Sequence, residues 1–392
     1  METHTLAGSR DVVAEGLVTR AQELIPLLSA HAAEAEENGR PAAAVVSALR
    51  EAGFLTLFAP ASLGGRQSSL ATAVEVFDRL GRGCGASAWT AMLASGGSYL
   101  TALLGDEARA DVWGAGPDAM VCGGFSPTAS AEVVPGGLSV SGRWQPLSGV
   151  LEAQWVLVAV PEHGMVLIPV AAGVVERTWR VAGMQGTGSH TFVVRDAFVP
   201  AHRVLSMPRM LSGGYASDHP GEPIYQAMPI PFLSVAMMGP VLGMGTGMLS
   251  ATLERLEQGK PIGGTVYRDA RNAPSVRFAI ADAASRVDTA RLHTARAVAD
   301  VEAAQRAGRL LPVEARARIR MDTAAAVTAL REAVRLLLDV NGASGFASAQ
   351  PVQRFWRDIE VATRHQMLAA DAGREAYGRA LLGVTEQSSP ML

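Results

Sequence analysis

Apolar side chains recur every three or four positions along the first 115 residues, which is the spacing of one face of an α-helix. The clearest stretch covers residues 11–37, and Pro26 inside it predicts a kinked or split helix, because proline cannot donate to the helix ladder. The same spacing predicts further helices at residues 41–52, 69–80 and 87–104. We therefore expect an N-terminal helical domain.

Between about residues 119 and 205 the pattern changes to short runs of Val, Thr and Trp that turn residues interrupt. Residues 131–134 and 138–141 flank Pro135-Gly136-Gly137, which is typical of a β-hairpin. Further strands are predicted at residues 155–160, 165–170, 174–181 and 190–194. This region is expected to form a compact antiparallel β domain.

Long amphipathic helices return near the C-terminus and predict a helical bundle. They cover residues 268–307, 312–341 and 350–382. Helices and strands that occur in separate zones favour an α+β fold over a doubly wound sheet, in which they would alternate. The resulting domains are residues 1–115, 116–210 and 211–392.

A stretch without charged residues lies between Glu222 and Glu254 and is long enough to span a bilayer. Four prolines interrupt it, and no Lys/Arg cluster flanks it as a membrane anchor would require. We interpret it as a helix buried on all sides in a helical core rather than as a membrane span.

Composition excludes several classes of function. The 392 residues carry a formal net charge of −3, with no basic block of the kind that nucleic-acid binders show. Two cysteines cannot form a disulfide framework or a four-cysteine zinc site, and no His/carboxylate spacing suggests a metal. The N-terminal residues lack the pattern of a secretory signal, so a cytoplasmic location is expected.

Four strings, in this order, resemble signatures of the acyl-CoA dehydrogenase superfamily. They lie at residues 49–65 (LREAGF, then P and LGG), 142–155 (GRWQPLSG, then AQW), 183–203 (GMQGTGS, then FVP and R) and 355–383 (FWRDI, then H, YGR and LG). The resemblance implies an acyl-CoA dehydrogenase-like fold: an N-terminal α-helical domain, a central antiparallel β-barrel and a C-terminal four-helix-type bundle.

The last string indicates the branch of the superfamily. Where many dehydrogenases carry a Tyr-Glu-Gly string with the catalytic carboxylate, residues 360–366 read EVATRHQ. A histidine there resembles the two-component (class D) flavin-dependent monooxygenases. That branch implies an oxygenase component that hydroxylates a small aromatic, polyketide-like or amine substrate through a C4a-hydroperoxyflavin. It also implies reduced flavin (FADH2 or FMNH2), O2, a separate NAD(P)H flavin reductase, and a homotetramer or dimer.

The resemblance also implies roles for individual residues. His365 and Ser148 are the predicted catalytic residues, since a histidine can move protons near neutral pH and a serine hydroxyl could bond near flavin N5. The predicted cofactor-binding residues are Trp144, Ser148, Gly149, Thr187, Gly188, Ser189 and Arg357. The predicted substrate pocket contains Trp89, Ser95, Gly97, Ser98 and Phe232.

Each role has a structural alternative. Ser148 could satisfy its own turn, Trp144 could pack in the β-domain core, and residues 187–189 could form an ordinary turn. Arg357 could belong to an ion-pair set at a helix end together with Asp358.

Two departures from the family pattern keep other functions open. Phenol-hydroxylating relatives often carry a histidine where this chain has Gly97, which leaves room for a substrate that needs no such base. The dehydrogenases' R-x-x-F-G contact to FAD is absent from residues 263–268, which leaves FAD and FMN both possible. The alternatives are an acyl-CoA or acyl-carrier dehydrogenase with tightly bound FAD, and a non-catalytic flavin-binding module.

Overall fold

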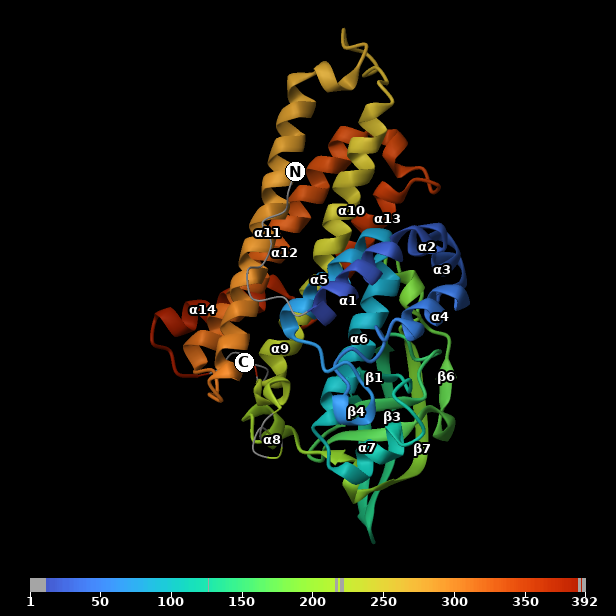
Figure 1. The fold of residues 1–392 in the computed structure, drawn as a ribbon, viewed down its shortest axis with the longest axis vertical. Coiled ribbons are helices and arrows are strands. Elements are labelled where there is room, and N and C mark those ends of the chain that lie inside the picture. Colours follow the sequence, from blue (N-terminus) through green and yellow to red (C-terminus); the bar gives the residue numbers. More distant parts are fainter. Residues whose placement is uncertain (1–11, 126, 216–217, 219–221, 387–388, 390–392) are drawn as a thin grey trace.

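The computed structural model describes residues 12–125, 127–215, 218, 222–386 and 389, and it divides into a helical bundle, a layer of N-terminal helices and a sheet region (Figure 1). The N-terminal helices are α1 (Val12–Glu23), α2 (Ile25–Ala30), α3 (Ala32–Asn38), α4 (Ala43–Glu51), α5 (Leu70–Gly83), α6 (Gly85–Ala102) and α7 (Asp106–Trp113). The split predicted around Pro26 is confirmed, because this proline occupies the first turn of α2. Residue 11, where the predicted helix begins, lies outside the described residues.

Helix α6 joins the helical layer to the sheet region. Nearly every residue of this helix is buried, and its sequence contains no acidic or basic side chain. It packs against α5 and α10 on the helical side and against strand β1 on the other. Such a helix, apolar all round, is what a central position between two layers requires.

The strands form two four-stranded sheets. One has the order β1 (Val121–Gly124), β4 (Trp155–Val160), β5 (Gly164–Pro169), β8 (Val204–Leu205). The other has the order β2 (Pro127–Val134), β3 (Gly137–Leu147), β7 (His190–Pro200), β6 (Val174–Glu176). The predicted hairpin is confirmed as β2–β3, with Val134 opposite Gly137.

The predicted closed antiparallel barrel is wrong in two respects. The two sheets are not closed into a barrel. In addition, β1 pairs with β4 in parallel, with Val121 opposite Trp155. Alternating apolar and polar side chains predict a strand and its buried face. Pairing between strands that are distant in sequence depends instead on tertiary packing, and here α6 packs along β1.

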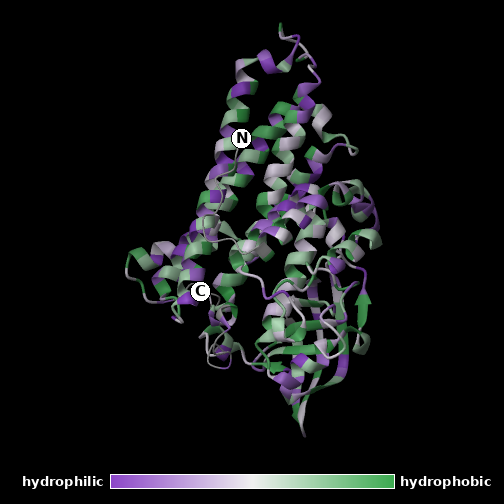
Figure 2. Cartoon of the chain, viewed as in Figure 1, coloured by the Kyte–Doolittle hydropathy of each residue, from purple (hydrophilic) through white to green (hydrophobic). Residues whose placement is uncertain are grey.

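The C-terminal part is helical, as predicted. It contains α8 (Met207–Leu211), α9 (Pro229–Ala236), α10 (Met238–Glu257), α11 (Pro274–Arg306), α12 (Val313–Asn341), α13 (Pro351–Ala362) and α14 (Ala370–Leu381). Short 3-10 helices connect elements along the chain at Ala61–Leu63, Val170–Ala172, Gln185–Thr187, Ala201–Arg203, Pro223–Gln226, Ala270–Asn272 and Ala343–Phe346. In Figure 2 the bundle helices α11 and α12 alternate hydrophilic and hydrophobic residues, as amphipathic helices do.

The predicted helix over residues 350–382 is two helices with a turn between them. The turn covers residues 363–369, so His365 does not lie on a helix. Arg320 on α12 donates hydrogen bonds to the backbone carbonyls of Gln366 and Met367. A tertiary partner therefore takes two carbonyls that a continuing helix would use, which explains why the local pattern missed the break.

The uncharged stretch forms α9 and most of α10. Residues Pro229–Glu257 are apolar and long enough to cross a membrane, and 89% of their most apolar window is buried within the fold. That burial agrees with the sequence interpretation of a core helix.

The predicted domain limits stay a prediction. Residue 115 lies between α7 and β1, whereas residue 210 falls inside α8. One apolar core runs through all three zones.

Candidate functional site

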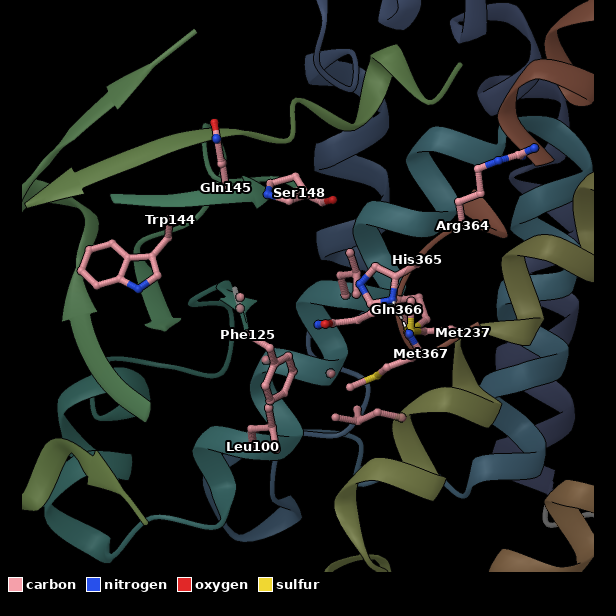
Figure 3. Close-up of a pocket in the computed structure, with 18 residues that line it drawn as sticks. Leu100, Phe125, Trp144, Gln145, Ser148, Met237, Arg364, His365, Gln366 and Met367 are labelled. Atoms are coloured by element: carbon pink, nitrogen blue, oxygen red, sulfur yellow. Dashed lines mark hydrogen bonds between the residues drawn. The ribbon is translucent and has the colours of Figure 1, made fainter. Parts of the chain in front are cut away.

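A cavity of about 250 Å³ lies where α6, the ends of strands β1 and β3, the start of the bundle and the turn after α13 meet (Figure 3). Its walls are mostly apolar. They are formed by Met92, Leu93, Gly96, Gly97, Leu100, Gly123, Gly124, Phe125, Trp144, Gln145, Pro146, Ser148, Leu233, Met237, Arg364, His365, Gln366 and Met367. This volume lies just below the usual range for ligand pockets, about 300–1,000 Å³, so the cavity suits one small ring system.

Glycines form the wall that α6 contributes. A Cβ at Gly97 would lie 2.2 Å from the carbonyl oxygen of Val121 on β1, so only glycine allows helix and strand this close. A Cβ at the neighbouring Gly96 would meet only the Cδ2 atom of Leu233, at 3.1 Å. Close approach of backbone to backbone thus defines one side of the cavity.

His365 enters the cavity from the turn after α13. Its Nδ1 accepts a hydrogen bond from the backbone N–H of Met367 at 3.3 Å, and Trp89 packs edge-on against the ring at 5.7 Å. Figure 3 shows the other ring nitrogen turned away from Met367. Because Nδ1 accepts, the neutral ring carries its hydrogen on Nε2.

The surroundings keep His365 neutral. Desolvation of the buried ring, followed by the nearby positive charge of Arg320, lowers the pKa of His365 to about 4. The guanidinium of Arg320 is itself buried and bonded to two carbonyls in the same turn. At neutral pH, His365 therefore offers the cavity an N–H donor rather than a positive charge.

Ser148 follows β3 and lies on another side of the cavity, in contact with a buried row of hydroxyl groups. Its Oγ lies 2.7 Å from Oγ of Ser189, which lies 2.6 Å from Oγ1 of Thr187. Thr187 Oγ1 donates to the carbonyl of Met184 at 2.8 Å. Two of the predicted cofactor-binding residues, Thr187 and Ser189, therefore stand behind Ser148 and do not themselves line the cavity.

The predicted glycines hold these loops together. The N–H of Gly149 donates to the carbonyl of Thr187 at 2.8 Å, and Gly149 has a φ of +76°. A Cβ at Gly188 would lie 2.9 Å from the carbonyl oxygen of Gly39. The bond from Gly149 joins the loop after β3 to the loop before β7, and Gly188 lets the second loop approach the segment between α3 and α4.

Two other predicted cofactor-binding residues have partners within the protein. Trp144 borders the cavity, but its Nε1 donates to the carbonyl of Ala159 at 2.7 Å and its ring stacks on Phe192. These contacts correspond to the alternative in which Trp144 packs in the core of the β domain. Arg357 pairs with Glu36 and donates to the carbonyl of Ala182, so it joins α13 to neighbouring segments.

Gly97 is the one predicted substrate-pocket residue that lines the cavity. Ser95 bonds to the backbone of Leu57 and Phe54. Ser98 donates to the carbonyl of Ala94 within the helix at 3.1 Å. Phe232 stacks on Tyr99 at 4.4 Å, outside the lining, and Trp89 reaches the site only through its contact with His365.

Helical geometry explains this sorting. The lining residues of α6 are Met92, Leu93, Gly96, Gly97 and Leu100, which lie on one face because side chains three or four positions apart are neighbours. Ser95 and Ser98 point elsewhere. The helical spacing of positions along α6 can be read from the sequence, and it places the two serines on other faces of the helix than Gly97.

Asp358 organises the site, although the sequence indicated only an ion-pair role beside Arg357 for this residue. Its buried carboxylate accepts the N–H of Met184 at 2.5 Å and so anchors the loop of residues 183–189 to α13. Burial raises the pKa of Asp358 to about 6. Among the described residues, no group of three or more His, Cys, Asp or Glu side chains could hold a metal ion.

Comparisons with known proteins agree with this geometry. Residues 21–114 match the acyl-CoA dehydrogenase N-terminal domain, and residues 235–370 match the C-terminal domain. The chain is 32% identical over 391 residues to the oxygenase component of the FADH(2)-dependent resorcinol hydroxylase of Rhizobium sp., covering 94% of both proteins. It is 32% identical to HsaA, the oxygenase subunit of a flavin-dependent monooxygenase of Mycobacterium tuberculosis, covering 93% of this chain and 94% of HsaA.

A solved structure extends the likeness to three dimensions. XiaF from Streptomyces sp., in complex with FADH2, superimposes with a TM-score of 0.92 at 30% identity, over 97% of this chain and 98% of XiaF. The cavity fits the ring system of such a cofactor, because its walls are mostly apolar and a few polar side chains complete them: Gln145, Ser148, Arg364, His365 and Gln366. The chain therefore belongs to the acyl-CoA dehydrogenase superfamily, in the branch formed by the oxygenase components of flavin-dependent two-component monooxygenases.

Proposed function

We propose that this protein hydroxylates a small, uncharged aromatic compound with reduced flavin and O2, the flavin being supplied by a separate NAD(P)H flavin reductase. The observation that carries the proposal is the small apolar cavity that has a neutral imidazole and a serine hydroxyl as its reactive polar groups. The related resorcinol hydroxylase supports an aromatic substrate.

The lining selects among the substrate classes. None of the lining residues is acidic, so a protonated amine would find no partner there. The guanidinium of Arg364 at the rim pairs with Glu360 at 2.6 Å. The related resorcinol hydroxylase favours a single small ring over a polyketide-like molecule.

The residues of the chain have separate tasks in this reaction. When bound, reduced flavin supplies the electrons and the reactive site for O2. Ser148 holds a polar edge of the cofactor, and the N–H of His365 donates a hydrogen bond to an oxygen atom in the cavity. The apolar walls keep water out, which limits the wasteful release of hydrogen peroxide.

The test mixes the anaerobic protein and chemically reduced FAD or FMN with O2 and a panel of small phenols, and measures hydroxylated product against hydrogen peroxide. Product is expected with the wild type. His365→Gln and Ser148→Ala should release more peroxide for each flavin consumed. Ser47→Ala, on the exposed face of α4, is the matched control and should behave as the wild type. Peroxide alone, with every phenol tested, would contradict the proposal.

An acyl-CoA dehydrogenase activity has no support in the cavity. Removal of the α-proton of a thioester needs a carboxylate base, and no carboxylate lines the cavity among the described residues. Anaerobic addition of an acyl-CoA to the protein with oxidised FAD is therefore expected to leave the flavin yellow.

A homotetramer or dimer, located in the cytoplasm, is part of the proposal. Large apolar side chains are exposed at Phe278 and Leu292 on α11 and at Leu381 on α14. Association of these helices with a second copy would remove that surface from water. Light scattering after size exclusion measures the mass, and a monomer would contradict this part.

A further inference from the structure

Three hydroxyl groups stand in a row behind the cavity and end on a backbone carbonyl. The oxygen atoms of Ser148 and Ser189 are 2.7 Å apart, those of Ser189 and Thr187 are 2.6 Å apart, and Thr187 Oγ1 lies 2.8 Å from the carbonyl oxygen of Met184. All three side chains are at most 8% exposed. The bonds are short, and the row has one end at the cavity and one end in the protein interior.

Each hydroxyl has one hydrogen to donate, and a carbonyl oxygen can only accept. Thr187 must therefore give its hydrogen to the carbonyl of Met184. Ser189 then has to donate to Thr187, and Ser148 has to donate to Ser189. The hydrogen of Ser148 is used inside the protein, and only its lone pairs remain for a ligand.

The interior end of the row is fixed. The carbonyl of Met184 also accepts from Trp179 Nε1 at 2.9 Å and from the N–H of Thr187 at 3.2 Å. The N–H of Met184 is held by Asp358. Because this carbonyl cannot turn away, the direction of the hydrogen bonds along the row cannot reverse.

We infer that Thr187 and Ser189 are positioning residues that make Ser148 a pure hydrogen-bond acceptor, so that the site selects a ligand atom bearing a hydrogen. This inference rests on the proposed function and deepens it. The inference places flavin N5 beside Ser148: reduced flavin carries a hydrogen on N5, whereas oxidised flavin has a lone pair there. The row of hydroxyls therefore favours the reduced cofactor over the oxidised one at the Ser148 side of the cavity.

The test compares the dissociation constants of oxidised and reduced flavin, measured anaerobically, in Thr187→Val and Thr187→Ser. Valine removes the hydroxyl at similar volume and leaves the Met184 carbonyl with its two N–H donors. Ser189 can then donate to Ser148, whose own hydrogen becomes available to the ligand. The preference for reduced flavin should fall about tenfold, which is the effect of one hydrogen bond. The midpoint potential of bound flavin should fall by about 30 mV.

Thr187→Ser keeps the hydroxyl and should keep the wild-type preference and potential. Ser189→Ala interrupts the row at another residue and should weaken the preference as Thr187→Val does, which covers the case in which the valine variant does not fold. Equal preferences in Thr187→Val, Ser189→Ala and the wild type would overturn the inference while leaving the proposed function intact. A wild type that binds neither form of flavin would overturn both.

Discussion

Two adjacent glycines of α6 offer a matched test of how the cavity wall is built. Gly97→Ala places a methyl group 2.2 Å from the backbone carbonyl of Val121, whereas Gly96→Ala places one 3.1 Å from the end of the Leu233 side chain. A side-chain tip can rotate away, but a strand carbonyl cannot. We therefore expect the first substitution to disturb the fold and the second to be tolerated.

The magnitude follows from what the two variants share. Both replace glycine in a helix interior, so both gain the same helix propensity, about 1 kcal/mol, and this gain cancels in the comparison. Overpacking against a rigid neighbour costs about 1–3 kcal/mol. The free energy of unfolding of Gly97→Ala should therefore lie about 2 kcal/mol below that of Gly96→Ala. Relief of the clash needs a separation of α6 and β1 by roughly 1 Å, which is enough to lower hydroxylation up to about 100-fold.

The assay is urea unfolding of both variants and the wild type, with midpoints compared at equal slope. The yield of hydroxylated product per flavin consumed is measured on the same samples. Gly96→Ala should match or exceed wild-type stability. If Gly97→Ala unfolds at the same urea concentration as Gly96→Ala, then the contact between α6 and β1 does not set the cavity wall.

Two predictions concern buried titratable groups. Since the pKa of Asp358 in the folded protein, about 6, lies above its usual 3.8, wild-type stability falls as pH rises from about 4 to about 6, by up to about 3 kcal/mol. Asp358→Asn should remove this fall. If the free energy of unfolding of the wild type exceeds that of the variant by the same amount at pH 4 and at pH 7, the reasoning is contradicted. Arg320→Met should raise the pKa of His365 above about 4, although burial of the ring will keep it below the usual 6.5. Quenching of Trp89 fluorescence by protonated His365 reports the midpoint of the His365 titration. Arg320→Lys keeps the positive charge and should keep the pKa of His365 low. Equal midpoints in Arg320→Met and Arg320→Lys would count against a charge effect.

Local sequence signals predicted the elements well and their long-range pairing poorly. Pro26 divided the first helix as expected, and Pro135-Gly136-Gly137 marked the β2–β3 hairpin. The parallel pairing of β1 with β4 joins residues more than 30 positions apart, and no local pattern encodes it. The turn that carries His365 depends on Arg320, which lies one helix earlier in the bundle.

The candidate site divides in the same way. The strings that resemble the family led to Ser148, Trp144 and His365, and a departure from the family pattern led to Gly97; all four border the cavity. What those strings lack is the direction of each bond. The bond from the Trp144 indole to β4 of the other sheet and the row of hydroxyls behind Ser148 both depend on atoms from separate segments of the chain. Hydrogen-bond polarity is a property of the assembled site, and residue identity alone does not reveal it.

Helix α13 connects two sides of the cavity. Asp358 near its end anchors the loop that orients Ser148, and His365 follows in the turn after the helix, seven positions further along. The distance between acceptor and donor across the cavity is therefore set by the length and phase of one helix. One residue inserted after Asp358 would turn the rest of α13 and the following turn by about 100°, and His365 would leave the cavity. An engineer who wishes to widen this site should shorten side chains on α6 and leave the register of α13 unchanged.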